Sequence, residues 1–291
     1  MSLIQFKREK YGIKLRRDAL EKIFSLKRVI NSPDIVQVFQ KQLESYETDI
    51  LEAIEILKQY QNIKPEYVQL WLFLLYDCFI YLDQQYKGNE ILDLLLFSVI
   101  QYPQGIIQFI EYQLFEILLR YQDIQALQII ETILKSQIIR SRDVQIEPLV
   151  NYICSYIPEH TNNILNILIL LSHNIECKAV IIANDPIMNM LLMENNQFQD
   201  ERSRILSHLS RGNVKMVYYF YNSKDKLQSL FYLNTKHCLK IIMRLICYDE
   251  TKKILSIMRE QRINIQIEKI SSQNYINYKN EIEDILQEFQ Q

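Results

Sequence analysis

The chain has 291 residues, of which 48% are hydrophobic, so it is long enough to bury a large core. It contains only 4 glycines and 6 prolines, too few for the many tight turns of an all-β protein. The net charge is −2, but residues 1–28 carry nine Lys/Arg against three Asp/Glu, or +6, which leaves 24 against 32, or −8, for the rest. The composition therefore predicts a helical protein with a basic N-terminal segment and an acidic body.

Neither a membrane span nor a secretory leader is indicated. The longest apolar stretch, residues 70–82, is interrupted by Asp77 and is shorter than the ~18 residues that a spanning helix needs. The N-terminus opens polar and basic rather than as a signal peptide. The five cysteines have no CxxC spacing, and an odd number of scattered thiols within apolar patterns is typical of reduced core residues. We therefore expect a soluble intracellular protein.

Apolar residues recur at helical spacing almost throughout the chain, as in residues 35–39, 50–57 and 129–134, which predicts amphipathic helices of roughly 10–15 residues. Prolines at positions 33, 65, 103, 148 and 186 are separated by 32, 38, 45 and 38 residues. Four of these five stand at or just before the start of an apolar run, where proline is tolerated in a helix. A loose period near 40 is typical of armadillo or HEAT repeats. A non-repetitive helical domain is the alternative.

The first predicted element is a basic arm, residues 1–30. It contains Phe6-Lys7 and Gly12, then Leu15-Arg16-Arg17, and ends in Ser25-Leu26-Lys27-Arg28. This order resembles the importin-β-binding arm of importin-α, although the arginine run is shorter here. The resemblance implies that an importin-β-like receptor binds this arm through Lys7, Arg16, Arg17, Lys27 and Arg28. A basic segment before a helix is also compatible with a solvated face or a nucleic-acid-binding arm.

Three further parts of the chain resemble importin-α in the same order. They are a first repeat in residues 32–36 and 49–58, a central turn and helix in 173–182 with Leu-Ser-His-Leu-Ser-Arg-Gly-Asn about 30 residues later, and a last repeat in 267–289. The resemblance implies an all-α, armadillo/HEAT-like helical repeat solenoid of about five to six repeats. Its parts are the arm, degenerate repeats in residues 31–250 and a C-terminal capping repeat in 251–291, in which the segment 282–289 caps the array.

In importin-α, third helices carry Trp and, four residues later, Asn on one face. The Asn amides hold the backbone of a lysine-rich signal, and the indoles pack against its lysine stems. The corresponding pairs here are expected to be Trp71–Leu75, Leu165–Ile169 and Arg204–His208, so these cargo-groove positions are degenerate. Core packing beside neighbouring leucines is the alternative role of Trp71, and exposed polar roles are the alternatives for Arg204 and His208.

No motif in the sequence indicates catalysis. The four histidines form no HExxH, and the four glycines form neither a P-loop nor a dinucleotide fingerprint. We therefore expect no metal, no cofactor and no enzyme activity. Residues 218–221, which read Tyr-Tyr-Phe-Tyr between Lys215 and Lys224, suggest a stacking surface for single-stranded nucleic acid. The acidic body argues against such binding, and aromatic runs on packed helices more often belong to the core.

The resemblance predicts a protein-binding adaptor of the cytoplasm and nucleus that carries specific protein cargo with an importin-β-like receptor. In that mechanism the arm lies in the groove of the array until importin-β withdraws it. The alternative is a non-transport armadillo scaffold, a fixed subunit of a larger protein complex, in which the arm is a remnant or a docking peptide. The degenerate groove favours the scaffold, and the basic arm favours transport.

Overall fold

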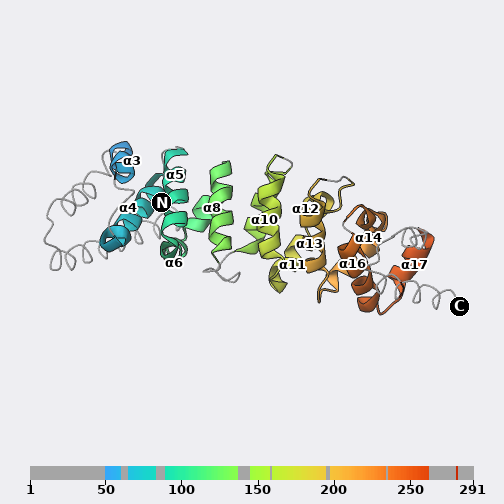
Figure 1. The fold of residues 1–291 in the computed structure, drawn as a ribbon. Helices are drawn as coiled ribbons and strands as arrows, with labels where there is room; N and C mark the ends of the chain where they lie inside the picture. Colours follow the sequence, from blue (N-terminus) through green and yellow to red (C-terminus); the bar gives the residue numbers. More distant parts are fainter. Residues whose placement is uncertain are drawn as a thin grey trace, which may run out of the picture. The chain divides into compact units, whose positions relative to one another are not determined.

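The computed structural model describes residues 50–59, 65–82, 89–136, 145–157, 159–194, 197–233, 235–261 and residue 280. Within these ranges every regular element is an α-helix or a 3₁₀-helix and none is a strand, which confirms the all-α expectation (Figure 1). The chain divides into two units, residues 1–139 and 140–291. The basic arm, the first-repeat segment 32–36 and the C-terminal segment 282–289 lie outside the described residues.

The first unit contains α3 (Ile50–Gln59), η1 (Pro65–Tyr67), α4 (Val68–Leu82), α5 (Asn89–Gln101), η2 (Pro103–Gly105), α6 (Ile106–Glu111), α7 (Leu114–Leu118) and α8 (Ile124–Lys135). Helix α5 packs against both α3 and α8. These three helices begin at residues 50, 89 and 124, which are 39 and 35 residues apart. Helix α4 packs on α3, α5 and α7 and forms the centre of this unit.

Helix α4 is apolar on almost every side, as a fully buried helix must be. Its residues 70–79 are all buried. Its aromatic rings meet those of neighbouring elements edge to face: Trp71 contacts Phe97, and Tyr76 contacts Phe109 at 5.4 Å between ring centroids. The Tyr76 hydroxyl donates a hydrogen bond to the carbonyl of Gly105 at 3.1 Å.

Gly105 is required by this packing. A Cβ atom at this position would lie 2.5 Å from a methyl carbon of Leu72 and 3.2 Å from the Tyr76 hydroxyl. The absence of a side chain therefore lets the η2 turn approach α4 closely.

The second unit contains α9 (Ile146–Cys154), α10 (Thr161–Leu171), α11 (Ile175–Ile182), α12 (Asp185–Leu191), α13 (Gln199–Leu209), α14 (Lys215–Asn222), α15 (Lys226–Ser229), η4 (Leu230–Tyr232), α16 (Thr235–Tyr248) and α17 (Lys253–Glu260). Helices α10, α13 and α16 pack one on the next and follow one another in Figure 1. They begin at residues 161, 199 and 235, which are 38 and 36 residues apart. Helices α9, α11, α14 and α17 pack in the same sequential way and form a second row.

Short polar side chains set the starts of several helices. The side-chain oxygens of Asp123, Asn174 and Asn184 accept hydrogen bonds from Gln125 N, Glu176 N and Ile187 N at 2.7, 2.9 and 3.2 Å. These N-caps satisfy amide groups that have no partner inside the helix. Four of the prolines also stand where the sequence predicted: Pro65 and Pro103 begin 3₁₀ turns, and Pro148 and Pro186 lie in the first turns of α9 and α12.

Asp249 connects α14 with α17, the last two helices of the second row. It is buried, and its carboxylate accepts hydrogen bonds from the Tyr221 hydroxyl, from Thr251 N at 3.2 Å and from Ile254 N at the start of α17. One carboxylate therefore holds the turn between α16 and α17 and ties it to α14.

The expectation that all cysteines are core residues is wrong for two of them. Cys78, Cys177 and Cys238 are buried, but Cys154 is half-buried and Cys247 is exposed. Cys247 lies on α16 one turn after Arg244, on the face of that helix that the core does not cover. Burial raises the pKa of Cys177 to about 11, so this thiol stays protonated.

No single helix among the described residues is long and apolar enough to cross a membrane. Only the segments Glu90–Gln101 and Pro103–Glu111 taken together meet that criterion, and they are bent by 110° at their junction.

Candidate functional site

Two of the expected groove positions lie in the core of the first unit. Trp71 and Leu75 are both completely buried on α4. The Trp71 indole N–H donates to the carbonyl of Leu57 at 3.0 Å, and the ring also contacts Tyr102. Trp71 therefore has the core role and presents no surface to a peptide.

The pair on α10 is partly buried. Leu165 belongs to the core, whereas Ile169 is partly exposed. Because α13 begins 38 residues after α10, the residues of α10 that correspond to Arg204 and His208 are Asn166 and Leu170, both partly exposed. The alignment by helix starts and the alignment expected from the sequence differ by one residue on α10.

The pair on α13 lies at the surface of the second unit. Arg204 is exposed and His208 is half-buried. Helix α16 begins 36 residues after α13, so Lys240 and Arg244 occupy the matching positions on the next helix of the row. Arg204 on α13 and Lys240 and Arg244 on α16 are therefore basic side chains at matching positions of two successive helices.

His208 lies against a second histidine. The rings of His173, in the turn after α10, and His208 meet edge to face with 4.2 Å between their centroids. Burial, followed by the nearby charges of His173, Arg204, Arg211 and Lys178, lowers the pKa of His208 to about 4. His208 is therefore neutral at pH 7 and sits within a concentration of positive charge.

Two more cations are fixed beside this pair by hydrogen bonds. Lys178 of α11 is buried, and its ammonium group donates to the carbonyl of Arg211 at 2.9 Å. Arg244 of α16 donates to the carbonyl of Ser207 and to the Ser207 and Ser210 hydroxyls, at 3.2 and 3.1 Å for the hydroxyls. Burial, followed by the charges of Arg211 and Arg244, lowers the pKa of Lys178. We call the set His173, Lys178, Arg204, His208, Arg211 and Arg244 the basic ridge.

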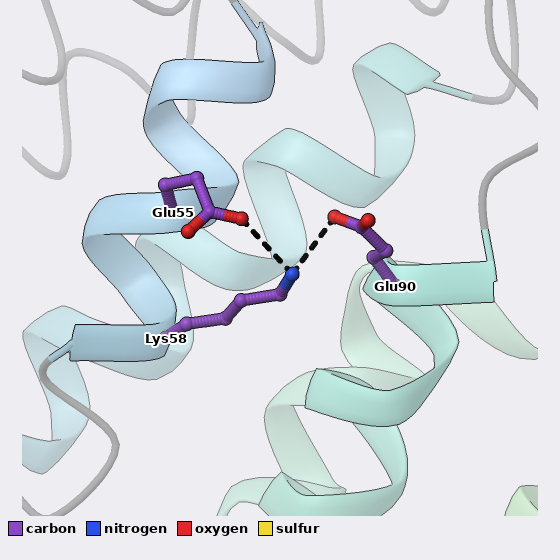
Figure 2. Close-up of polar contacts among 3 residues, drawn as sticks. All are labelled: Glu55, Lys58 and Glu90. Atoms are coloured by element: carbon purple, nitrogen blue, oxygen red, sulfur yellow. Dashed lines mark hydrogen bonds and ion pairs between the residues drawn. The ribbon is translucent and has the colours of Figure 1, made fainter.

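In contrast to the basic ridge, the row formed by α3, α5 and α8 in the first unit carries several carboxylates at its surface. Figure 2 shows the Lys58 ammonium of α3 between Glu55 of the same helix and Glu90 of α5, at 3.1 and 2.8 Å. Hydrogen bonds to Glu90 and Glu55 raise the pKa of Lys58. On the same α5 face, Asp93 accepts a hydrogen bond from the side chain of Gln125 on α8. Since these groups are exposed and already paired, each contact contributes only about 0–1 kcal/mol to stability.

The second unit also contains a cavity of about 310 Å³ beside the first turns of α10 and α13. Arg202 lines it and is almost completely buried, with its guanidinium donating to the carbonyls of Met193 at 2.6 Å and Phe198 at 3.4 Å. These bonds join the turn after α12 to α13, so Arg202 serves the packing of the turn. In the part of the chain that the structure describes, no three His, Cys, Asp or Glu side chains gather in a way that could hold a metal ion.

The sequence pointed to Arg204 and His208 but missed Lys178, Arg211 and Arg244. A signal existed, because Arg244 repeats the position of His208 one helix later, but the interval of 36 residues follows only from where α13 and α16 begin. The receptor-binding candidates Lys7, Arg16, Arg17, Lys27 and Arg28 lie outside the described residues.

No protein family, curated protein or solved structure matches this chain.

Proposed function

We propose that this chain is a protein-binding adaptor built from armadillo-like helical repeats and that it has no catalytic role. One observation carries the proposal: in each unit, helices of one row begin 35 to 39 residues apart and pack on one another in sequence. Such rows are typical of helical repeat proteins, which bind partners along an extended face. An array of this kind needs neither a cofactor nor a metal.

Transport of protein cargo between cytoplasm and nucleus is the first form of this role. Its support is the basic arm, whose sequence resembles a segment that binds importin-β. The test is a pull-down of the full chain with an importin-β-like receptor, compared with the variant Arg16→Glu with Arg17→Glu. We expect the variant to lose binding, and binding of the wild type to weaken as salt rises, because exposed charge pairs are screened. Equal binding of both proteins would contradict the transport role.

The scaffold role has an observation of its own in its favour. The only tryptophan of the chain is in the core, and Arg204, at a position that the resemblance assigns to the groove, is exposed on α13. A positive charge repels a lysine-rich signal, and no indole remains to pack against its lysine stems. We therefore expect this array, as a subunit of a larger complex, to bind a partner of different chemistry.

Affinity purification of the tagged full chain from its native cells separates the two roles. Recovery of an importin-β-like receptor supports transport, and recovery of one stable set of subunits without that receptor supports the scaffold. If the tagged chain retains no other protein, the adaptor proposal is wrong.

A further inference from the structure

We propose that the basic ridge binds an extended acidic segment, rich in Asp and Glu, of a partner protein. This inference rests on the proposed protein-binding function and adds the chemistry of the partner. It is also the reverse of what the resemblance to importin-α implies, because that family's groove takes a basic peptide.

Three cations of the ridge are not paired with a carboxylate in the described part of the chain. Within the described residues no carboxylate forms an ion pair with Lys178, Arg204 or Arg211. Glu176 and Glu201 are close to these three cations in sequence, and among the described residues neither forms an ion pair with them. Cations that lie together in a partly buried place repel one another, and an anionic ligand removes that cost. The unpaired cations therefore favour binding of an anion over a neutral or basic ligand.

The geometry of the ridge suits a chain rather than a single small anion. Its members come from the turns after α10 and α13 and from the helices α11, α13 and α16. Packed helices lie about 8–10 Å apart, so an extended segment of about ten residues, at ~3.3 Å per residue, is long enough to pass over two of them. Exposed guanidinium groups such as those of Arg204 and Arg211 bind carboxylates through paired hydrogen bonds.

Two cations of the ridge are held in place before any ligand binds. The ammonium of Lys178 is fixed on the Arg211 carbonyl, and the guanidinium of Arg244 is fixed on Ser207 and Ser210. Groups that are already positioned lose little freedom on binding, which favours affinity.

The remainder of the surface favours an acidic protein segment over nucleic acid. Outside residues 1–28 the chain carries 24 Lys/Arg against 32 Asp/Glu, or −8, so a long phosphate backbone would meet repulsion beyond the ridge. A short acidic segment is confined to the ridge and avoids this repulsion.

The test is a fluorescence-anisotropy titration of the full chain with a fluorescein-labelled Asp/Glu peptide of about ten residues. The variant is Arg204→Glu with Arg211→Glu, two exposed positions whose exchange leaves the core intact. The matched control is Lys215→Glu with Arg259→Glu, which makes the same change in net charge at exposed positions of α14 and α17. We expect the ridge variant to bind about tenfold more weakly or worse, the control to bind within about twofold of the wild type, and wild-type affinity to fall as salt rises.

Two competitors complete the experiment: a lysine-rich peptide and a single-stranded oligonucleotide of the same length. Failure of the lysine-rich peptide to compete supports the proposal. Equal weakening by the ridge and control variants would overturn it, because binding would then follow net charge alone. Tighter binding of the oligonucleotide than of the acidic peptide would also overturn it. If either of these two results is obtained but a protein partner is still recovered from native cells, the ridge proposal fails and the adaptor role stands. If no partner is recovered from native cells, the adaptor role itself is contradicted.

Discussion

Replacing Trp71 with Phe distinguishes a core residue from a groove residue. The side chain is fully buried, and its indole N–H donates to the carbonyl of Leu57 in the last turn of α3, where helix carbonyls lack an intrahelical donor. Phenylalanine keeps an aromatic ring but removes the donor and part of the volume. Leaving a buried carbonyl without its donor costs about 1–3 kcal/mol, and the unfilled space adds to this, so we expect a loss of about 2–4 kcal/mol.

Thermal unfolding followed by far-ultraviolet circular dichroism measures this loss. About 2–4 kcal/mol corresponds to a fall in Tm of roughly 5–15 °C. The control is Ile107→Ala, also in the first unit, at a side chain that is 54% exposed; we expect its effect to stay within about 0.5 kcal/mol. Because Trp71 is the only tryptophan, the wild-type emission reports on this site alone, and we expect it to be blue-shifted in the native state and to move to longer wavelength in denaturant.

The reasoning about Trp71 is refuted if the Trp71→Phe variant unfolds at the wild-type temperature. It is refuted equally if the native emission already lies where the denatured emission lies. Either result would place the indole at the surface and restore it as a candidate for a peptide-binding groove.

Three further changes test the packing and electrostatics. Gly105→Ala should destabilise by about 1–3 kcal/mol in urea unfolding because its methyl group meets Leu72, whereas Gly212→Ala, with free space but a φ of +67°, should cost only about 1 kcal/mol of backbone strain. The pKa of His208, about 4 when folded against 6.5 ordinarily, makes the unfolded chain take up the proton first as pH falls. Stability should therefore decline between pH 6.5 and about 4, by about 1 kcal/mol after solvent screening, and His208→Gln should remove that component; an unchanged pH dependence in the variant would contradict the assignment. Asp249→Ala should lower the unfolding free energy by about 2–3 kcal/mol, with Asp249→Asn, which keeps an acceptor, losing less; a loss below about 0.5 kcal/mol for Asp249→Ala would show that the hydrogen bonds at this turn matter little.

The sequence by itself determined the class of the fold and many helix starts, because these depend on local chemistry. Apolar residues at helical spacing and the scarcity of glycine and proline predicted an all-α chain, which the described residues confirm. Pro103 begins η2 and Pro186 lies in the first turn of α12 for the reason that the sequence supplied, because a missing N–H costs little in a first turn.

The role of Trp71 was decided by the tertiary structure. A tryptophan that shares a helix face with the residue four positions later can belong to a binding groove or to a core. Only the contacts of α4 with the surrounding helices show that Trp71 belongs to the core. For Cys247 the sequence pattern predicted burial, and the structure places the residue at the surface. Its apolar neighbours predicted burial, but α16 packs through its opposite face.

The basic ridge was also decided by the tertiary structure. Its contacts join residues far apart in the chain: Lys178 reaches Arg211, 33 positions away, and Arg244 reaches Ser207, 37 positions away. Local patterns report which face of a helix is apolar, but not which helices become neighbours or in what register. The meeting of these cations depends on the packing of α16 on α13 and on the contact of Lys178 of α11 with the turn after α13, neither of which a local pattern reports.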